Sequence, residues 1–223
     1  MQLFYTPDHA RVGDVIPYYE DGEFKLFYLK NWNPYFGSDK TLGWHLLTTK
    51  DLIHYESETA IGILGGTGCV IKVDGLYHLY YCVFEDQPQR QYVCHATSTD
   101  LTNWTKYPEE TFGPDESIYL LTDWRDPHVI WNEEEKCWWM ILCAQSQGNT
   151  NRRGCVGLCK SADLHHWTCC EPLYAPQSSM SAYECPDLFY MNGWWYLVFS
   201  QFTDRFQTIY RMSRSCNGPW IRP

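Results

Sequence analysis

The sequence contains no apolar run of the length that spans a bilayer, about 18 residues or more. Its first residues, MQLFYTPDHARVGD, also lack a cationic stretch followed by an apolar one. A secretory signal needs both of those regions in that order. We therefore expect no contact with a membrane, and we expect a cytoplasmic protein.

Positive charge is scarce. Lys and Arg number 17 against 27 Asp and Glu, which gives a formal net charge of -10 at pH 7. Such a surface repels a phosphate backbone, so the composition argues against nucleic acid as a partner. A neutral ligand such as a carbohydrate is compatible with it.

No C-x-x-C pair occurs among the eleven cysteines, and no matching His or Cys pair follows Cys155 and Cys159. The cysteines are odd in number and scattered through apolar stretches, which is typical of reduced thiols that behave as small apolar residues. We therefore expect reduced thiols, no metal site and no cofactor.

Long helical periodicity is absent, whereas aromatic residues make up 17% of the chain, including 11 Trp and 17 Tyr. Aromatic residues favour the half-buried surface of a sheet, so this composition favours an all-β protein. Four stretches share an apolar strand, a turn and an aromatic-rich strand: residues 13–29, 68–83, 125–144 and 184–201. Hairpins are predicted in three of these stretches by turn dipeptides, Asp21-Gly22, Asp74-Gly75 and Asn192-Gly193.

A second motif, Asp-Leu-x-x-aromatic, follows each of the first three stretches, at Asp51, Asp100 and Asp163. The side chain of such an Asp can accept hydrogen bonds from the backbone of its own turn. We expect that structural role for each of them, with the aromatic residue filling the adjacent gap.

The openings of the four repeated stretches are 55, 57 and 59 residues apart, at Asp14, Cys69, Asp126 and Cys185. A repeat of this length that contains four strands is typical of a β-propeller blade. The sequence therefore predicts one all-β domain, residues 1–223, with four propeller blades at about 1–57, 58–112, 113–174 and 175–223.

Acidic residues open the first strand of three repeats at nearly the same register: Asp14, Asp126 and Glu184. The second repeat has Cys69 there. Inner strands of propeller blades surround a central channel, so residues of one register converge at one end of it. Because converging carboxylates repel one another, one pKa among them is raised, as a general acid near neutral pH requires. We predict a catalytic site there, although a single acid before a strand is more often a turn cap.

These residues resemble motifs of glycoside hydrolase family 32, the β-fructofuranosidases that include invertases, levanases and inulinases. WRDP at 124–127 is similar to the family's Arg-Asp-Pro motif, and YECPDLF at 183–189 is similar to its Glu-Cys-Pro motif. Residues 42–56, LGWHLLTTKDLIHYE, resemble its Trp-Gly-His segment. Gly13-Asp14-Val15-Ile16-Pro17 stands where the family usually has Asn-Asp-Pro-Asn-Gly. The family's catalytic domain has five blades, so the resemblance implies a five-bladed propeller of which four blades are visible in this sequence.

The resemblance implies a retaining glycosidase that cleaves terminal fructosyl linkages of sucrose, a fructan or a related oligosaccharide. In that mechanism Asp14 is the nucleophile, Glu184 is the acid and base, and Asp126 stabilises the oxocarbenium-like transition state. Arg125 either pairs with a carboxylate or bonds a sugar hydroxyl. The further substrate-binding candidates are Trp44, Trp124, Trp32 and Cys185, and Trp32 is equally suited to plug a loop.

Two other functions fit the same pattern. An inverting arabinan- or xylan-type hydrolase has similar acids on the same architecture, but its two carboxyl groups stand about 6.5–9.5 Å apart instead of about 5–5.5 Å. A non-catalytic carbohydrate-binding propeller would keep the pocket without the reaction. The sequence leaves open which sugar is bound, exo or endo action, and the oligomeric state.

Overall fold

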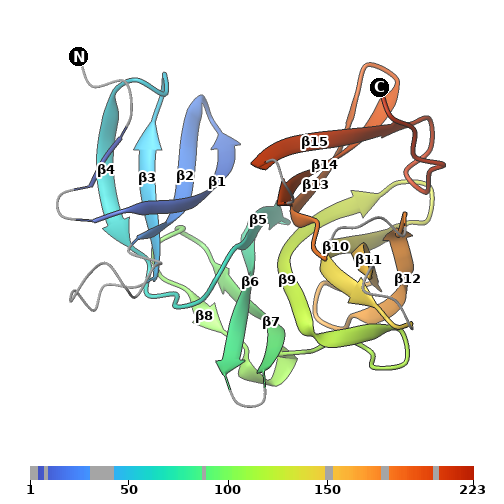
Figure 1. The fold of residues 1–223 in the computed structure, drawn as a ribbon. Helices are drawn as coiled ribbons and strands as arrows, with labels where there is room; N and C mark the ends of the chain where they lie inside the picture. The colour runs from blue at the N-terminus through green and yellow to red at the C-terminus, as the bar shows by residue number, and fades with distance from the viewer. Residues whose placement is uncertain are drawn as a thin grey trace.

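The computed structural model describes residues 5–7, 10–30, 43–86, 89–148, 153–176, 181–202 and 206–223. The strands in these ranges form four antiparallel sheets that follow one another along the chain. Figure 1 shows the sheets arranged in an arc, with the first strand of each sheet nearest the centre. Within the described ranges no helix is long and apolar enough to cross a membrane. The chain is an all-β propeller with four blades.

The first sheet contains β1 (Val12–Glu20), β2 (Glu23–Lys30), β3 (Gly43–Thr49) and β4 (Tyr55–Ala60), so it extends past the boundary expected at residue 57. The second contains β5 (Gly68–Val73), β6 (Leu76–Asp86), β7 (Gln89–Ser98) and β8 (Thr105–Lys106), and is followed by the 3-10 helix η1 (Pro108–Glu110). The third contains β9 (Tyr119–Asn132), β10 (Cys137–Ser146), β11 (Gly154–Ser161) and β12 (Thr168–Tyr174). The fourth contains β13 (Glu184–Met191), β14 (Trp194–Phe202) and β15 (Phe206–Ser213).

The three predicted hairpins are confirmed. Each has a two-residue turn whose first residue has a φ between 48° and 51° and whose glycine has a φ between 80° and 85°. Positive φ at both positions defines the type I′ turn, and its twist matches the twist of the flanking strands. The turn dipeptides therefore determine the pairing register at the outer end of β1, β5 and β13.

The expected role of the Asp-Leu-x-x-aromatic motif is also confirmed. Asp51, Asp100 and Asp163 each accept hydrogen bonds from the backbone N–H groups two and three residues later. These backbone hydrogen bonds lower the pKa of all three carboxyl groups. The indole of Trp104 donates to the carbonyl of Leu101 at 3.0 Å, which holds the aromatic residue against its turn.

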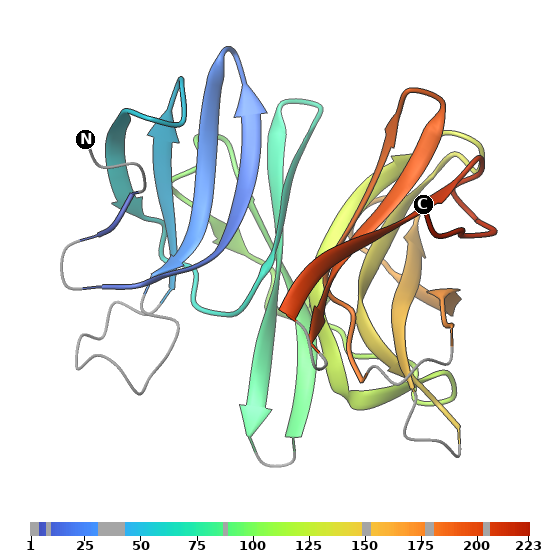
Figure 2. The ribbon, with the colours of Figure 1, turned by 45° about the horizontal axis from the view of Figure 1, so that its top comes forward.

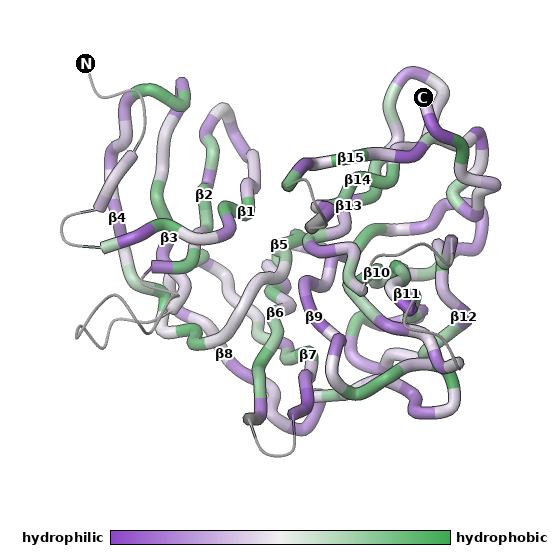
Figure 3. The backbone as a smooth tube through the Cα atoms, in the orientation of Figure 1, coloured by the Kyte–Doolittle hydropathy of each residue, from purple (hydrophilic) through white to green (hydrophobic). Residues whose placement is uncertain are grey.

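The hydrophobic core consists of three clusters, each between two neighbouring sheets. Their members include Trp44 with Leu79, Tyr80 with Met140, and Trp139 with Leu197. Figure 3 shows hydrophobic and hydrophilic segments alternating along the chain, as expected for strands with two different faces. Figures 1 and 2 place the first and fourth sheets at opposite ends of the arc. The inner strands are in contact in chain order, β1 with β5, β5 with β9 and β9 with β13.

Candidate active site

Three of the four inner strands contain a β-bulge at the same place. The pairing register shifts after Gly13 in β1, after Arg125 in β9 and after Glu184 in β13. The residue that follows each of these has a positive φ: Asp14 at 32°, Asp126 at 57° and Cys185 at 48°. A bulge interrupts the alternation of side chains and turns one of them in a new direction, which is why bulges are frequent beside active sites.

Counting back from the hairpin turns shows which residues are equivalent in the four blades. The inner strands β1, β5, β9 and β13 each end directly before a turn. Six positions before the last residue of these strands lie Asp14, Thr67, Asp126 and Cys185, respectively. Asp14 and Asp126 therefore share one register, whereas Glu184 lies one residue before it. The expectation that Cys69 occupies this register in the second blade was wrong. Because β5 pairs with β6 without a bulge, Cys69 lies two residues further along and the equivalent residue is Thr67.

An axial cavity of about 360 Å³ lies between the inner strands. Its walls are consecutive residues of all four strands, 14–17, 67–71, 126–129 and 185–187. The first residues of the four lining segments, Asp14, Thr67, Asp126 and Cys185, are thus the ones that share a register. A cavity of this volume is within the range of small-ligand sites in proteins.

The carboxyl group of Asp126 is the most buried acid of the site, with an exposed fraction of 7%. Its Oδ2 accepts a hydrogen bond from the backbone N–H of Cys185 at 3.0 Å. Burial raises the pKa of Asp126 to about 6, against the opposing effects of Arg125 and of the Cys185 N–H, and the charges of Glu184 and Asp14 raise it further. A raised pKa was expected from repulsion among the three acids; it is found at Asp126, where burial contributes more than the charges of Glu184 and Asp14.

Arg125 links the acids of β9 and β13. Its Nη2 donates to Glu184 Oε1 at 2.6 Å, its Nη1 donates to Asp123 Oδ1 at 2.5 Å, and its Nε lies 3.8 Å from Asp126 Oδ2. Burial opposes the charge on the guanidinium, but these acids raise the pKa of Arg125 nevertheless. Of the two roles left open by the sequence, the structure shows the pairing with a carboxylate. Arg125 thus lies between Glu184 and Asp126, and Glu184 is not among the residues that line the cavity.

Asp14 is exposed, and its Oδ2 accepts a hydrogen bond from the hydroxyl of Thr67. Thr67 and Asp123 are two residues of the site that sequence reasoning missed. Thr67 lies in the GGTGC segment, residues 65–69, and directly precedes β5, an inner strand that contains no acid. Asp123 lies two residues before Arg125 and hence on the same face of a strand. Thr67 could have been identified from its place before β5, and Asp123 from its place on the same strand face as Arg125.

The structure corrects two of the proposed sugar-binding aromatic residues. Trp44 is 1% exposed and its indole donates to the carbonyl of Gly66 at 3.0 Å. Trp124 is fully buried and packs against Tyr119, with 5.1 Å between ring centroids. Neither side chain has a surface that a sugar could contact, because both fill the core between blades. Trp32 lies outside the described residues, and Cys185 does line the cavity.

Within the described part of the chain, the group of side chains whose spacing suits a metal ion is His95, Glu110 and His165. None of the three lines the cavity. The site around Asp14 and Asp126 therefore has the chemistry of carboxylates and a guanidinium, which is suited to proton transfer, nucleophilic attack and binding of sugar hydroxyls.

Comparisons with known proteins agree with this geometry. The sequence model of the glycosyl hydrolases family 32 N-terminal domain matches residues 15–217, a range that contains Asp126 and Glu184 and begins one residue after Asp14. The chain is 26% identical to a levanbiose-producing levanase of Bacillus subtilis strain 168, over 99% of this chain and 41% of the levanase. It is 28% identical to a sucrose-6-phosphate hydrolase of Escherichia coli, over 77% of this chain and 36% of the hydrolase. The chain thus spans less than half the length of these curated relatives.

Solved structures show the same fold. A family 32 β-fructofuranosidase of Bombyx mori in complex with sucrose superposes with a TM-score of 0.70 at 23% identity, covering 92% of this chain and 48% of that one. A levansucrase of Bacillus subtilis superposes with a TM-score of 0.74 at 15% identity, covering 96% of this chain and 70% of that one. At these identities the likeness is one of architecture.

Proposed function

The chain belongs to glycosyl hydrolase family 32, and from this premise we propose that it cleaves terminal fructosyl linkages of sucrose, a fructan or a related oligosaccharide. The observation that carries the proposal is the position of Asp14 and Asp126. They occupy equivalent bulges at one end of the axial cavity, and Arg125 pairs with Glu184, which directly precedes the cavity-lining residue Cys185. A carbohydrate is the substrate class that this set of groups recognises.

The proposed reaction is a double displacement with retention. The exposed carboxylate of Asp14, oriented by the Thr67 hydroxyl, attacks the anomeric carbon of the fructosyl unit and forms a fructosyl–enzyme ester. Glu184 donates a proton to the departing glycosidic oxygen. In the second step Glu184 takes a proton from water, the water oxygen attacks the same carbon, and the Asp14 carboxylate is released.

Asp126 is proposed to bind hydroxyl groups of the fructosyl ring. Burial disfavours its charge, as the raised pKa of about 6 shows. A buried carboxylate with few donors gains much from additional O–H groups, since a hydrogen bond to a charged group contributes about 1.5–3 kcal/mol. Ring hydroxyls that approach Asp126 more closely as the ring flattens would therefore stabilise the transition state more than the bound substrate.

We further propose that a fifth blade completes the ring, as in a five-bladed propeller. Both end sheets present large apolar side chains on the surface, Val15 and Tyr19 on β1 and Phe206 and Tyr210 on β15. Large exposed apolar side chains that lie together on one face usually mark an interface. If the faces are uncovered in this chain, it should bind a hydrophobic dye, and Tyr19→Lys with Tyr210→Lys should weaken that binding. A chain that binds no dye would contradict the proposal.

The cysteines support a cytoplasmic location, which we propose on that basis. All eleven are free in the structure, and six of them are buried. Titration of thiols in the denatured protein, purified without reductant from its native compartment, should give eleven free groups. Fewer than eleven would indicate disulfides and an oxidising compartment.

The activity is tested by incubating the protein with sucrose, inulin, levan and arabinan and measuring the released monosaccharide. Release of fructose is expected, and release of arabinose alone would support the inverting alternative instead. Including methanol as an acceptor distinguishes the two stereochemical courses, because only a fructosyl–enzyme can transfer its sugar to methanol with retention. Binding of a fructan without turnover would identify a carbohydrate-binding propeller.

Three variants assign the roles. Asp14→Asn and Glu184→Gln are each expected to reduce turnover to less than about one-thousandth, as expected for loss of a nucleophile or an acid–base group. On a substrate whose leaving group departs without a proton, azide should raise the turnover of Glu184→Gln, because azide attacks the fructosyl–enzyme without needing a base. The control Glu56→Gln removes a half-exposed carboxylate of a surface ion pair and should keep full activity. Full activity in Asp14→Asn would refute the proposed mechanism.

A further inference from the structure

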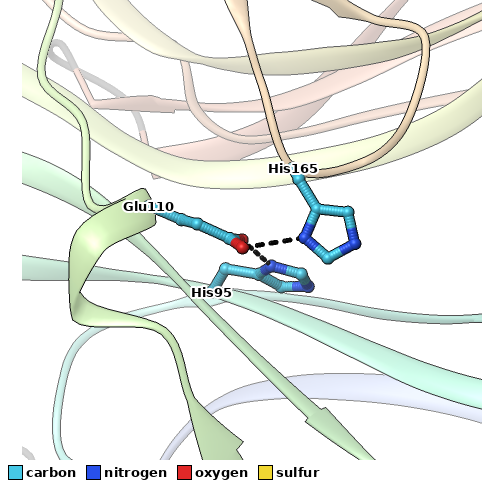
Figure 4. Close-up of side chains that lie close together, drawn as sticks. All are labelled: His95, Glu110 and His165. Carbon is cyan, nitrogen blue, oxygen red and sulfur yellow. Dashed lines mark hydrogen bonds and ion pairs between the residues drawn. The ribbon is translucent and has the colours of Figure 1, made fainter.

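A second cluster of titratable side chains lies between the second and third blades, away from the cavity. Figure 4 shows the carboxylate of Glu110, on η1, facing the rings of His95, on β7, and His165, in the turn after β11. The Nδ1 atoms of these rings lie 2.5 and 2.8 Å from the two oxygens of Glu110. Three segments that are separate in sequence thus present two imidazoles and one carboxylate to one point.

The surroundings hold this cluster in place. His95 is 3% exposed and is stacked on Tyr80, with 4.5 Å between ring centroids and an interplanar angle of 6°. The hydroxyl of Tyr80 donates to the carbonyl of Leu164 at 2.6 Å, which ties the turn that bears His165 to the second blade. The packing of the two blades therefore fixes the positions of the three side chains before any ion binds.

The donor set is the one that divalent transition ions prefer. Zn²⁺ binds imidazole nitrogen and carboxylate oxygen at about 2.0–2.2 Å, and a tetrahedral arrangement at that distance separates ligand atoms by roughly 3.4 Å. One ligand atom from each of the three residues already lies within 4.8 Å of the others. We propose that His95, Glu110 and His165 bind a divalent transition-metal ion, Zn²⁺ fitting best, and that the ion joins the second blade to the third.

His78 supplies the supporting contact that such a site needs. Its Nδ1 lies 3.0 Å from Nε2 of His95. When Nδ1 of His95 binds the ion, the ring proton is on Nε2 and is donated to His78. When Nδ1 of His95 instead donates to Glu110, Nε2 accepts a hydrogen bond from Nδ1–H of His78. Ligating histidines usually have such a partner for their second nitrogen, and its loss typically weakens metal affinity about 10- to 100-fold.

His165 provides an entry path, because its side chain is 38% exposed while that of Glu110 is 16% exposed. The ion can therefore reach the cluster from solvent on the His165 side. With two neutral imidazoles and one carboxylate, the fourth position of a tetrahedral ion is left for water. The net charge of -10 on the chain favours binding of a cation at any such opening.

The test uses the full chain after treatment with a chelator. Zn²⁺ is titrated by calorimetry, and Co²⁺ is titrated by visible absorption, which is intense for tetrahedral sites and gains a near-ultraviolet thiolate band if cysteine is a ligand. One ion per chain without a thiolate band is expected. His165→Ala should weaken binding at least 100-fold, and His78→Phe about 10- to 100-fold.

The matched control is His166→Ala. His166 directly follows His165, its side chain is 88% exposed, and among the described ion pairs it pairs with Asp163 alone. This variant should therefore bind the ion as the unmodified chain does. Nitrogen NMR of the imidazole rings reports the ligand directly, since the proton of His95 should move from Nδ1 to Nε2 on metal addition. Undiminished binding by His165→Ala, a thiolate band, or no binding by the unmodified chain would each overturn the proposal.

Discussion

Replacing Asp126 by Asn should stabilise the fold at neutral pH, although the carboxylate that it replaces accepts a hydrogen bond. Asp126 is 7% exposed, and burial raises its pKa to about 6 from an ordinary value of 3.8. A pKa difference of about two corresponds to about 3 kcal/mol in the free energy of unfolding. Asn keeps an oxygen that can accept the Cys185 N–H, and Arg125 keeps its partners Asp123 and Glu184.

The sign of the pH dependence follows from proton binding. Between pH 3.8 and about 6 the folded state holds a proton on Asp126 that the unfolded state has lost, so the folded state binds more protons. Stability therefore falls as the pH rises through this window. Below it Asp126 is protonated in both states and costs nothing, and above it the full cost of about 3 kcal/mol is present. Asn carries no such proton, so its advantage should be absent below the window and complete above it.

The measurement is urea unfolding, followed by tryptophan fluorescence, of both proteins across this pH range. The control is Asp187→Asn, which lines the same cavity but has a side chain that is 53% exposed. A change within about 0.5 kcal/mol is expected for it at every pH. If Asp126→Asn were less stable than the unmodified chain above pH 7, or if the difference did not vary with pH, the reasoning about burial would be refuted. Loss of hydrolytic activity together with a gain in stability would identify Asp126 as a site where function opposes stability.

Four further substitutions test other parts of the structure. Arg125→Met should lower the free energy of unfolding by about 3–5 kcal/mol in the same assay, because it leaves Asp123 and Glu184 without their counter-charge. A loss below about 1 kcal/mol would contradict a buried ion network. Gly68→Ala should cost about 3 kcal/mol or more, since the added Cβ would lie 1.8 Å from the carbonyl oxygen of Tyr80. Gly75→Ala, where nothing lies within 4 Å but φ is +85°, should cost only about 1–2 kcal/mol, and equal costs at the two glycines would be evidence against the close approach. Thr67→Val removes the hydroxyl that donates to Asp14 and should reduce kcat/KM about 10- to 100-fold, while the free energy of unfolding stays unchanged. Unaltered kinetics would show that Thr67 does not contribute to catalysis.

Much of the architecture could be predicted because it is encoded locally. Asp21-Gly22 and its counterparts form type I′ turns with their own backbone angles, and Asp100 and its counterparts accept hydrogen bonds from N–H groups only two and three residues away. Such features depend on the residues within one turn, so they are visible in a sequence that is read a few residues at a time. The repeat of these local signals was sufficient to predict four blades.

The details of the site were less accessible. Thr67 and Cys69 could be distinguished only by the pairing of β5 with β6, because a bulge moves every later residue by one position. Trp124 was expected near a sugar because it adjoins Arg125, yet alternation along β9 directs it into the core. Adjacent residues of a strand point to opposite faces, so proximity in sequence to a functional residue is a poor guide to function.

The sequence by itself determined the strands, the turns and the order of the four blades, since each follows from contacts between near neighbours and from the alternation of apolar residues. Only the tertiary structure decided how much of each acid is buried, which carboxylates Arg125 joins, and that His95, Glu110 and His165 meet. The partners in these contacts are far apart in the chain, as Arg125 and Glu184 are at a separation of 59 residues. Burial and long-range pairing depend on how whole sheets pack, and no short segment of the sequence carries that information.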